Sequence, residues 1–156
     1  MADYQKYNRI SRVVSSLSMI GSIYIIQDVL RDPRKRKESI YHHIMIGLST
    51  FDILSSFFLH FLRTWPQPEE HGPFSYGTLA TCDAAGFIAT IGMVGSPLYH
   101  CSLATYFLLV LKYNWTRNRM RDIEKWFHIV PWTVAIITSV TLLATQVYGP
   151  FLGGCW

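Results

Sequence analysis

The stretch LATCDAAGFIATIGMVGSPLYHCSLATYFLLVLKY, residues 79–113, decides the fold class of this chain. It is long, apolar and almost free of charged residues. A transmembrane helix needs about 20 mostly apolar residues to cross roughly 30 Å of hydrocarbon. Because residues 79–113 exceed that length, we expect a single helix that tilts in the bilayer or projects beyond it.

Three further segments, 13–30, 40–62 and 126–148, are long and apolar enough to span a membrane. They end at prolines, glycine or charged residues, which do not continue a buried helix. Half of all residues (50%) are hydrophobic and only 15% are charged, and no run shows the short alternating segments of a membrane barrel. The sequence therefore predicts one transmembrane domain over residues 1–156, an all-α, multi-pass membrane helical bundle.

The basic residues concentrate in two connecting segments, and this asymmetry predicts the orientation. Ten follow the first and third helices, against four in the N-terminal tail and the second connection. The positive-inside rule places both basic segments in the cytoplasm and the N-terminus outside, so the glycosylation pattern Asn-Trp-Thr at 114–116 would be cytoplasmic. The ten are Arg31, Arg34, Lys35, Arg36, Lys37, Lys112, Arg117, Arg119, Arg121 and Lys125; the four are Lys6, Arg9, Arg12 and Arg63.

Asp52 falls near the middle of the second apolar segment. An ionisable side chain at that depth costs roughly 2.5 to 3.5 kcal/mol on insertion scales, and such residues are often functional. We interpret Asp52 as a polar switch that binds a cation or changes partners between conformations. The alternative is a structural carboxyl, hydrogen-bonded to Ser or Thr of neighbouring helices.

Small residues recur on one face of the third segment, at Ala85, Ala89, Gly92 and Ser96. Small residues let membrane helices approach closely, so we expect this helix at the centre of the bundle. The alternative is that small residues are simply common in membrane helices.

The chain has three cysteines. Cys82 and Cys155 lie on the predicted outer side, where an oxidising environment favours a disulfide, although spacing alone does not give their distance. Cys101 is expected to be free and buried, as a small apolar residue.

Several classes of function are disfavoured. The histidines form no HxxxH pair on one helical face and no carboxylate stands at ligand spacing, so no metal site is expected. Paired acids, phosphate-binding glycine loops and a Ser/His/Asp set are missing, which argues against an enzyme or a cofactor. The net charge of +4 reflects membrane orientation and indicates no nucleic-acid partner.

Together these features resemble the first four helices of a G-protein-coupled receptor. The motif GLSTFDILSS carries Asp52 at the family's sodium-linked acid, Cys82 opens a long third helix, Trp132 lies within the fourth, and Cys155 follows it. The stretches SLSMIGSIYII and PLYHCSLATYFLLVLKYNW are more similar to the cyclic-AMP-receptor-like branch than to rhodopsin-like receptors. The resemblance implies a disulfide between Cys82 and Cys155.

The resemblance also implies a location and partners. It places the chain in the plasma membrane, with Gly92, Ser96 and Tyr99 bordering a cavity for an unknown extracellular small-molecule ligand. A heterotrimeric G protein would meet Lys112, Tyr113 and Arg117, although LVLKYNW replaces the acid-Arg-Tyr triplet of rhodopsin-like receptors.

Helices five to seven of that family have no counterpart in these 156 residues. We therefore expect the N-terminal half of a receptor that works with the missing helices. The rival hypothesis is a self-sufficient four-helix scaffold or channel subunit, in which Ser49, Asp52, Ser55 and Ser56 of the second helix would line a pore.

Overall fold

The computed structural model describes residues 2–33, 39–62, 65–68, 75–151 and 154–155. Its long helices are α1 (Ala2–Arg31), α3 (Ile40–Ser55), α4 (Leu79–Leu111) and α5 (Arg117–Ala144), and α3 continues as the π-helix η1 (Ser56–Phe61). Two short strands, β1 (Pro150–Phe151) and β2 (Gly154–Cys155), pair antiparallel after α5.

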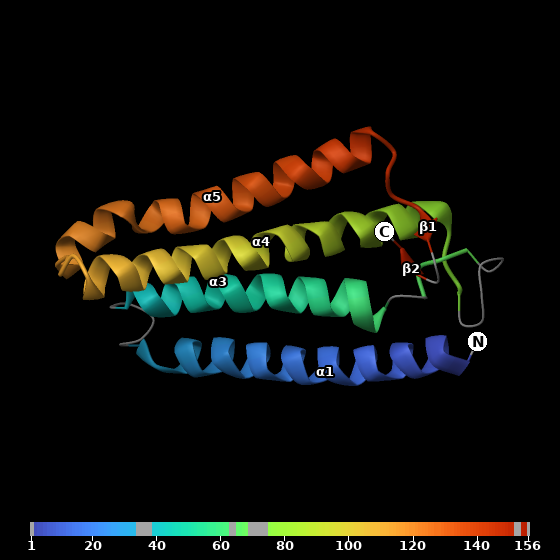
Figure 1. Ribbon diagram of the computed structural model, residues 1–156, viewed down its shortest axis with the longest axis horizontal. Coiled ribbons are helices and arrows are strands. Elements are labelled where there is room, and N and C mark those ends of the chain that lie inside the picture. The colour runs from blue at the N-terminus through green and yellow to red at the C-terminus, as the bar shows by residue number, and fades with distance from the viewer. Residues whose placement is uncertain (1, 34–38, 63–64, 69–74, 152–153, 156) are drawn as a thin grey trace.

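Successive helices run in opposite directions through one bundle (Figure 1). The helix α4 packs against α3, η1 and α5, whereas α1 packs against α3 and η1. The two ends of the chain lie at the same end of the bundle, and α1 and α4 end, and α3 and α5 begin, at the other (Figure 1).

Within the described part of the chain, four helical stretches are long and apolar enough to cross a membrane: Arg9–Arg31, Ile40–Phe61, Leu79–Leu111 and Arg117–Ala144. Large apolar side chains such as Leu17 and Ile20 on α1, and Ile137 on α5, remain exposed on the outside of the bundle. Exposed apolar surface of this extent fits a hydrocarbon environment. The predicted all-α, multi-pass membrane helical bundle is confirmed.

The predicted bounds of two helices are wrong. The first helix begins at Ala2 instead of residue 13, and the fourth covers Arg117–Ala144 instead of 126–148. A search for apolar spans detects only the part of a helix that suits hydrocarbon, and both helices begin with polar turns beyond that part. The fourth ends early because Gln146 adopts a positive φ of 52°, a left-handed conformation that a helix cannot contain.

The third and second helices agree closely with their predicted bounds of 79–113 and 40–62. The α4 helix ends at Leu111, and Asn114, with a φ of 48°, turns the chain toward α5. The sequence did not indicate that the second helix changes to π-helical form after Ser55.

The small face of α4 packs at the centre of the bundle, as predicted. Ala85, Ala89 and Gly92 are buried. A Cβ atom on Gly92 would lie 2.4 Å from the backbone nitrogen of Ser55, so only glycine permits this approach of α4 to the second helix. Cys101, in contrast, was expected to be buried. It is free but exposed, because it lies on the outward face of α4.

The basic residues Arg34, Lys35, Arg36, Lys37 and Arg63, and the side chain of Lys6, lie outside the described residues. Among the described ones, Arg31 and the residues from Lys112 to Lys125 lie at the end of the bundle opposite the two termini (Figure 1). We call this the basic end, and the opposite one, which carries the strands, the hairpin end.

Candidate functional site

Asp52 meets Ser96 between α3 and α4. The Ser96 hydroxyl donates a hydrogen bond to Asp52 Oδ1 over 2.5 Å, and both side chains are half-buried. A hydroxyl that donates to a carboxylate offsets part of the free energy needed to hold the charge away from water. The sequence therefore identified two residues that the fold brings into direct contact.

The backbone beside Asp52 is unusual. The Ser55 hydroxyl donates to the Asp52 carbonyl oxygen over 3.2 Å, and η1 begins one residue later. At its end the Leu62 N–H donates to the carbonyl of Phe57, five residues earlier, over 2.8 Å. Such π-helical turns are rare and occur often at functional sites.

The side chain of Tyr99 lies one helical turn from Ser96, toward the basic end. It is 1% exposed, and its ring centroid lies 5.2 Å from that of Phe51. Phe51 in turn packs against Trp132 of α5, with 4.7 Å between ring centroids. Phe51 and Tyr99 also line the core between α3, α4 and α5, so this aromatic cluster sets how the three helices pack.

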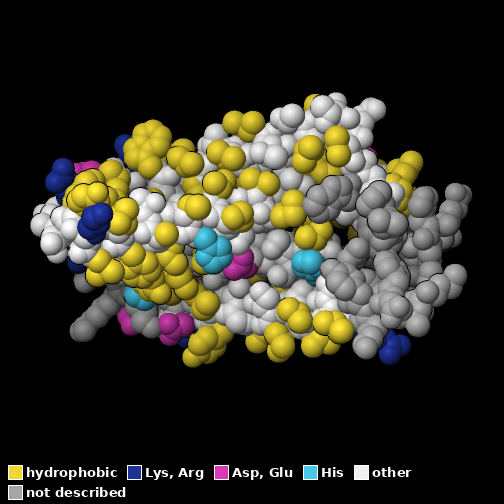
Figure 2. Space-filling view, in the orientation of Figure 1, with side chains coloured by type: hydrophobic (Ala, Val, Ile, Leu, Met, Phe, Trp, Pro, Cys, Tyr) yellow, Lys and Arg dark blue, Asp and Glu magenta, His cyan; other side chains and the backbone are white. Residues whose placement is uncertain are grey.

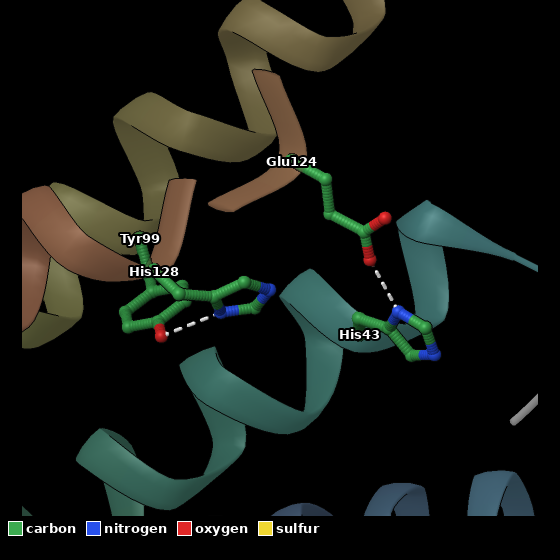
Figure 3. Close-up of polar contacts among 4 residues, drawn as sticks. All are labelled: His43, Tyr99, Glu124 and His128. Carbon is green, nitrogen blue, oxygen red and sulfur yellow. Dashed lines mark hydrogen bonds and ion pairs between the residues drawn. The ribbon is translucent and has the colours of Figure 1, made fainter. Parts of the chain in front are cut away.

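Two histidines continue the polar contacts toward the basic end (Figure 3). The Tyr99 hydroxyl and His128 Nδ1 are 2.9 Å apart, which links α4 to α5. His43 Nδ1 lies 2.5 Å from Glu124 Oε1, which links α3 to α5. Glu124 and His128 are four residues apart, so they share one face of α5. These contacts join all three helices.

The sequence did not indicate this network. The spacing of Glu124 and His128 places them on one helical face, and that was the one available signal. Their partners His43 and Tyr99 come from other helices, so spacing within one segment cannot reveal them. Among the described residues, no group of three or more His, Cys, Asp or Glu side chains could hold a metal ion.

A disulfide joins Cys82, at the start of α4, to Cys155 of β2, as predicted. The two Cα atoms are 5.1 Å apart, and both cysteines are buried, with Ala85 and Phe58 packed beside them. Strand β1 pairs with β2 through Pro150 and Cys155. The segment that follows α5 is thereby folded back onto the beginning of α4.

Three residues were predicted to border a ligand cavity, and all three face neighbouring helices. Gly92 and Tyr99 are buried in helix contacts, and Ser96 is bonded to Asp52. The three predicted G-protein contacts, Lys112, Tyr113 and Arg117, are exposed at the basic end. Their roles toward a ligand and a G protein remain predictions.

Comparison with known proteins finds no matching family model, no matching curated protein and no matching solved structure. The site is therefore interpreted from the residues of this chain.

Proposed function

We propose that this chain forms helices one to four of a G-protein-coupled receptor of the plasma membrane. The observation that carries the proposal is the Cys82–Cys155 disulfide, which fastens the segment after α5 to the start of α4 at the end opposite the basic connections. The contact of Asp52 with Ser96 in the middle of the bundle supports it.

In this proposal, an extracellular small molecule binds near the hairpin end, together with helices five to seven. Gly92, Ser96 and Tyr99 lie in the helix contacts that hold α4 beside that ligand cavity. Ligand binding favours one of two arrangements of the bundle, and Asp52 acts as the polar switch, because exchange of its Ser96 hydrogen bond changes how α3 and α4 meet. Lys112, Tyr113 and Arg117 then contact a heterotrimeric G protein.

The proposed orientation places the basic end in the cytoplasm and the N-terminus outside, by the positive-inside rule. It can be tested at Asn114, an exposed residue in the turn between α4 and α5. Because that turn is cytoplasmic, we expect no glycan on Asn114 in microsomes, whereas an acceptor site added before Ala2 is glycosylated. A gel shift removed by the Asn114→Gln substitution would contradict the orientation.

The receptor function is tested by coupling to G proteins in cells. The chain is expressed alone and together with a separate polypeptide that supplies helices five to seven of a receptor, and energy transfer to a panel of Gα subunits is measured. We expect coupling only when both parts are present, and a loss of coupling in Lys112→Ala and Arg117→Ala variants. Absence of coupling to every Gα subunit would refute the proposal.

The rival channel hypothesis predicts ion flux through the purified chain in liposomes. It requires an open row of polar side chains, but Ser49 and Ser56 are only 2% and 7% exposed, because neighbouring helices cover them. We therefore expect no flux. Flux that disappears in an Asp52→Ala variant would favour the channel over the receptor.

A further inference from the structure

The first turns of α5 carry a row of cations. Arg117, Arg121 and Lys125 are spaced four residues apart, so they lie one above another on one side of the helix, and all three are exposed. Like charges at this spacing repel each other and destabilise a helix. An anionic partner that lies along this row would remove that repulsion.

The acids nearby do little to neutralise Arg121 and Lys125. Between residues 112 and 125, Lys112, Arg117, Arg119, Arg121 and Lys125 outnumber Asp122 and Glu124. Glu124 is directed to α3, where it meets His43. Asp122 is exposed, and within the described part of the chain the structure gives no ion pair between Asp122 and Arg121 or Lys125.

The row of cations continues directly into an apolar surface. Ile129, Trp132 and Ile136 follow Lys125 at spacings of four, seven and eleven residues, so they share its side of α5, and they are 46%, 39% and 42% exposed. At 1.5 Å per residue, the distance from Lys125 to Ile136 is roughly 16 Å. That is about half the thickness of the hydrocarbon core.

An aromatic side chain marks the boundary between the two parts. Trp126 is 54% exposed, and Lys125 Nζ lies 5.9 Å from the centroid of its ring. Tryptophan is enriched at the level of the lipid headgroups, so we expect Arg121 and Lys125 in the headgroup layer. Figure 2 shows Lys and Arg side chains at this end of the bundle, beside apolar side chains.

We propose that this side of α5 binds an anionic phospholipid. Arg121 and Lys125 contact the phosphate and the other acidic groups of the headgroup, while an acyl chain lies along Ile129, Trp132 and Ile136. The cations adjoin an apolar stripe that is about as long as one leaflet is deep, and this combination is complementary to an amphiphile. A soluble anion would contact only the cations. The inference goes beyond receptor function and does not depend on it.

The test measures which lipids the chain retains. The full chain is reconstituted in bilayers of phosphatidylcholine mixed with phosphatidylserine or phosphatidylinositol bisphosphate, extracted into mild detergent, and analysed by native mass spectrometry. A basic residue near an anionic surface contributes about 1 kcal/mol, which corresponds to roughly fivefold in affinity. We expect Arg121→Gln to lower the enrichment of the anionic lipid about fivefold, and addition of Lys125→Gln to lower it further.

Arg119→Gln is the matched control. It removes the same charge from the same turn as Arg121→Gln. Arg119 lies two residues before Arg121, which places it on nearly the opposite side of the helix, where it stacks on Trp115. We expect it to retain most of the enrichment. All three substitutions are at exposed positions, so thermal unfolding in phosphatidylcholine alone should be unchanged, which separates lost binding from misfolding.

Three results would overturn the proposal. The first is equal retention of the anionic and zwitterionic lipids by the unsubstituted chain. The second is an equal loss in Arg119→Gln and Arg121→Gln, which would mean diffuse attraction instead of a site. The third concerns the Arg121→Gln/Lys125→Gln variant. If its lipid selectivity is unchanged while its G-protein coupling is weakened, the row belongs to a protein interface.

Discussion

The two ends of the bundle are held by different kinds of contact. At the hairpin end, a covalent bond joins Cys82 to Cys155. At the basic end, the polar links between helices include the hydrogen-bonding contacts of Tyr99 with His128 and of His43 with Glu124 (Figure 3). A disulfide opens only by reduction, whereas hydrogen bonds can exchange partners. We therefore expect α5 to move relative to α4 more easily at the basic end.

Loss of the disulfide should have the largest effect on stability. Its cysteines are 73 residues apart, and closing a loop of that length contributes about 4 kcal/mol in the chain-entropy description. We expect Cys82→Ser or Cys155→Ser to lower the thermal unfolding temperature in detergent clearly, and reductant to add nothing further. Cys101→Ser, at a free and exposed cysteine, is the control and should unfold like the original chain.

Gly92→Ala should have the next largest effect on stability, because the added methyl group pushes α4 away from α3. The added Cβ would lie 2.4 Å from the Ser55 nitrogen and 2.9 Å from the Phe51 carbonyl oxygen. Overpacking of this kind typically costs about 1 to 3 kcal/mol. Gly21→Ala is the matched control, since a Cβ there meets nothing within 4 Å. Equal unfolding temperatures for the two variants would contradict this close approach.

Substitution of Asp52 tests the contact midway between the two ends. Hydrogen bonds between membrane helices contribute about 1 kcal/mol, so Asp52→Ala should destabilise the bundle by about that amount. Asp52→Asn retains an acceptor for the Ser96 hydroxyl and should be closer to the original chain. In a double-mutant cycle with Ser96→Ala, additive effects on the unfolding free energy would show that the two side chains do not interact.

The smallest effect is expected at the basic end, for Glu124→Gln. The side chains of His43 and Glu124 are 32% and 20% exposed, so solvent partly screens the pair, and ion pairs at the surface contribute about 0.2 to 1 kcal/mol. We expect faster hydrogen exchange in the first turns of α5 and little change in global unfolding. Asp122→Asn, two residues earlier and exposed, is the control. If both variants exchange alike, the His43 contact does not hold α5.

Contacts at the hairpin end were easier to predict from the sequence than contacts at the basic end. Cys82 lies near the beginning of one apolar run and Cys155 follows another, so the topology alone assigns them to one end. Asp52 was conspicuous because a lone acid in an apolar run is costly. Glu124 lies among the charged residues of the first turns of α5, and His43 stands beside a second histidine, His42, in an apolar segment, so their pairing is not visible until the helices are placed side by side.

The sequence alone determined that the chain is a bundle of membrane-spanning helices, how many apolar helices it has, and which connections share an end. The reason is that hydrocarbon demands about 20 apolar residues per crossing, with every backbone hydrogen bond made inside the helix. Only the tertiary structure decided which side chains meet, such as Ser96 with Asp52 and Glu124 with His43. Those pairs depend on how the helices are rotated and how closely they approach. The packing of Gly92 against Ser55 and of Phe51 against Tyr99 sets both.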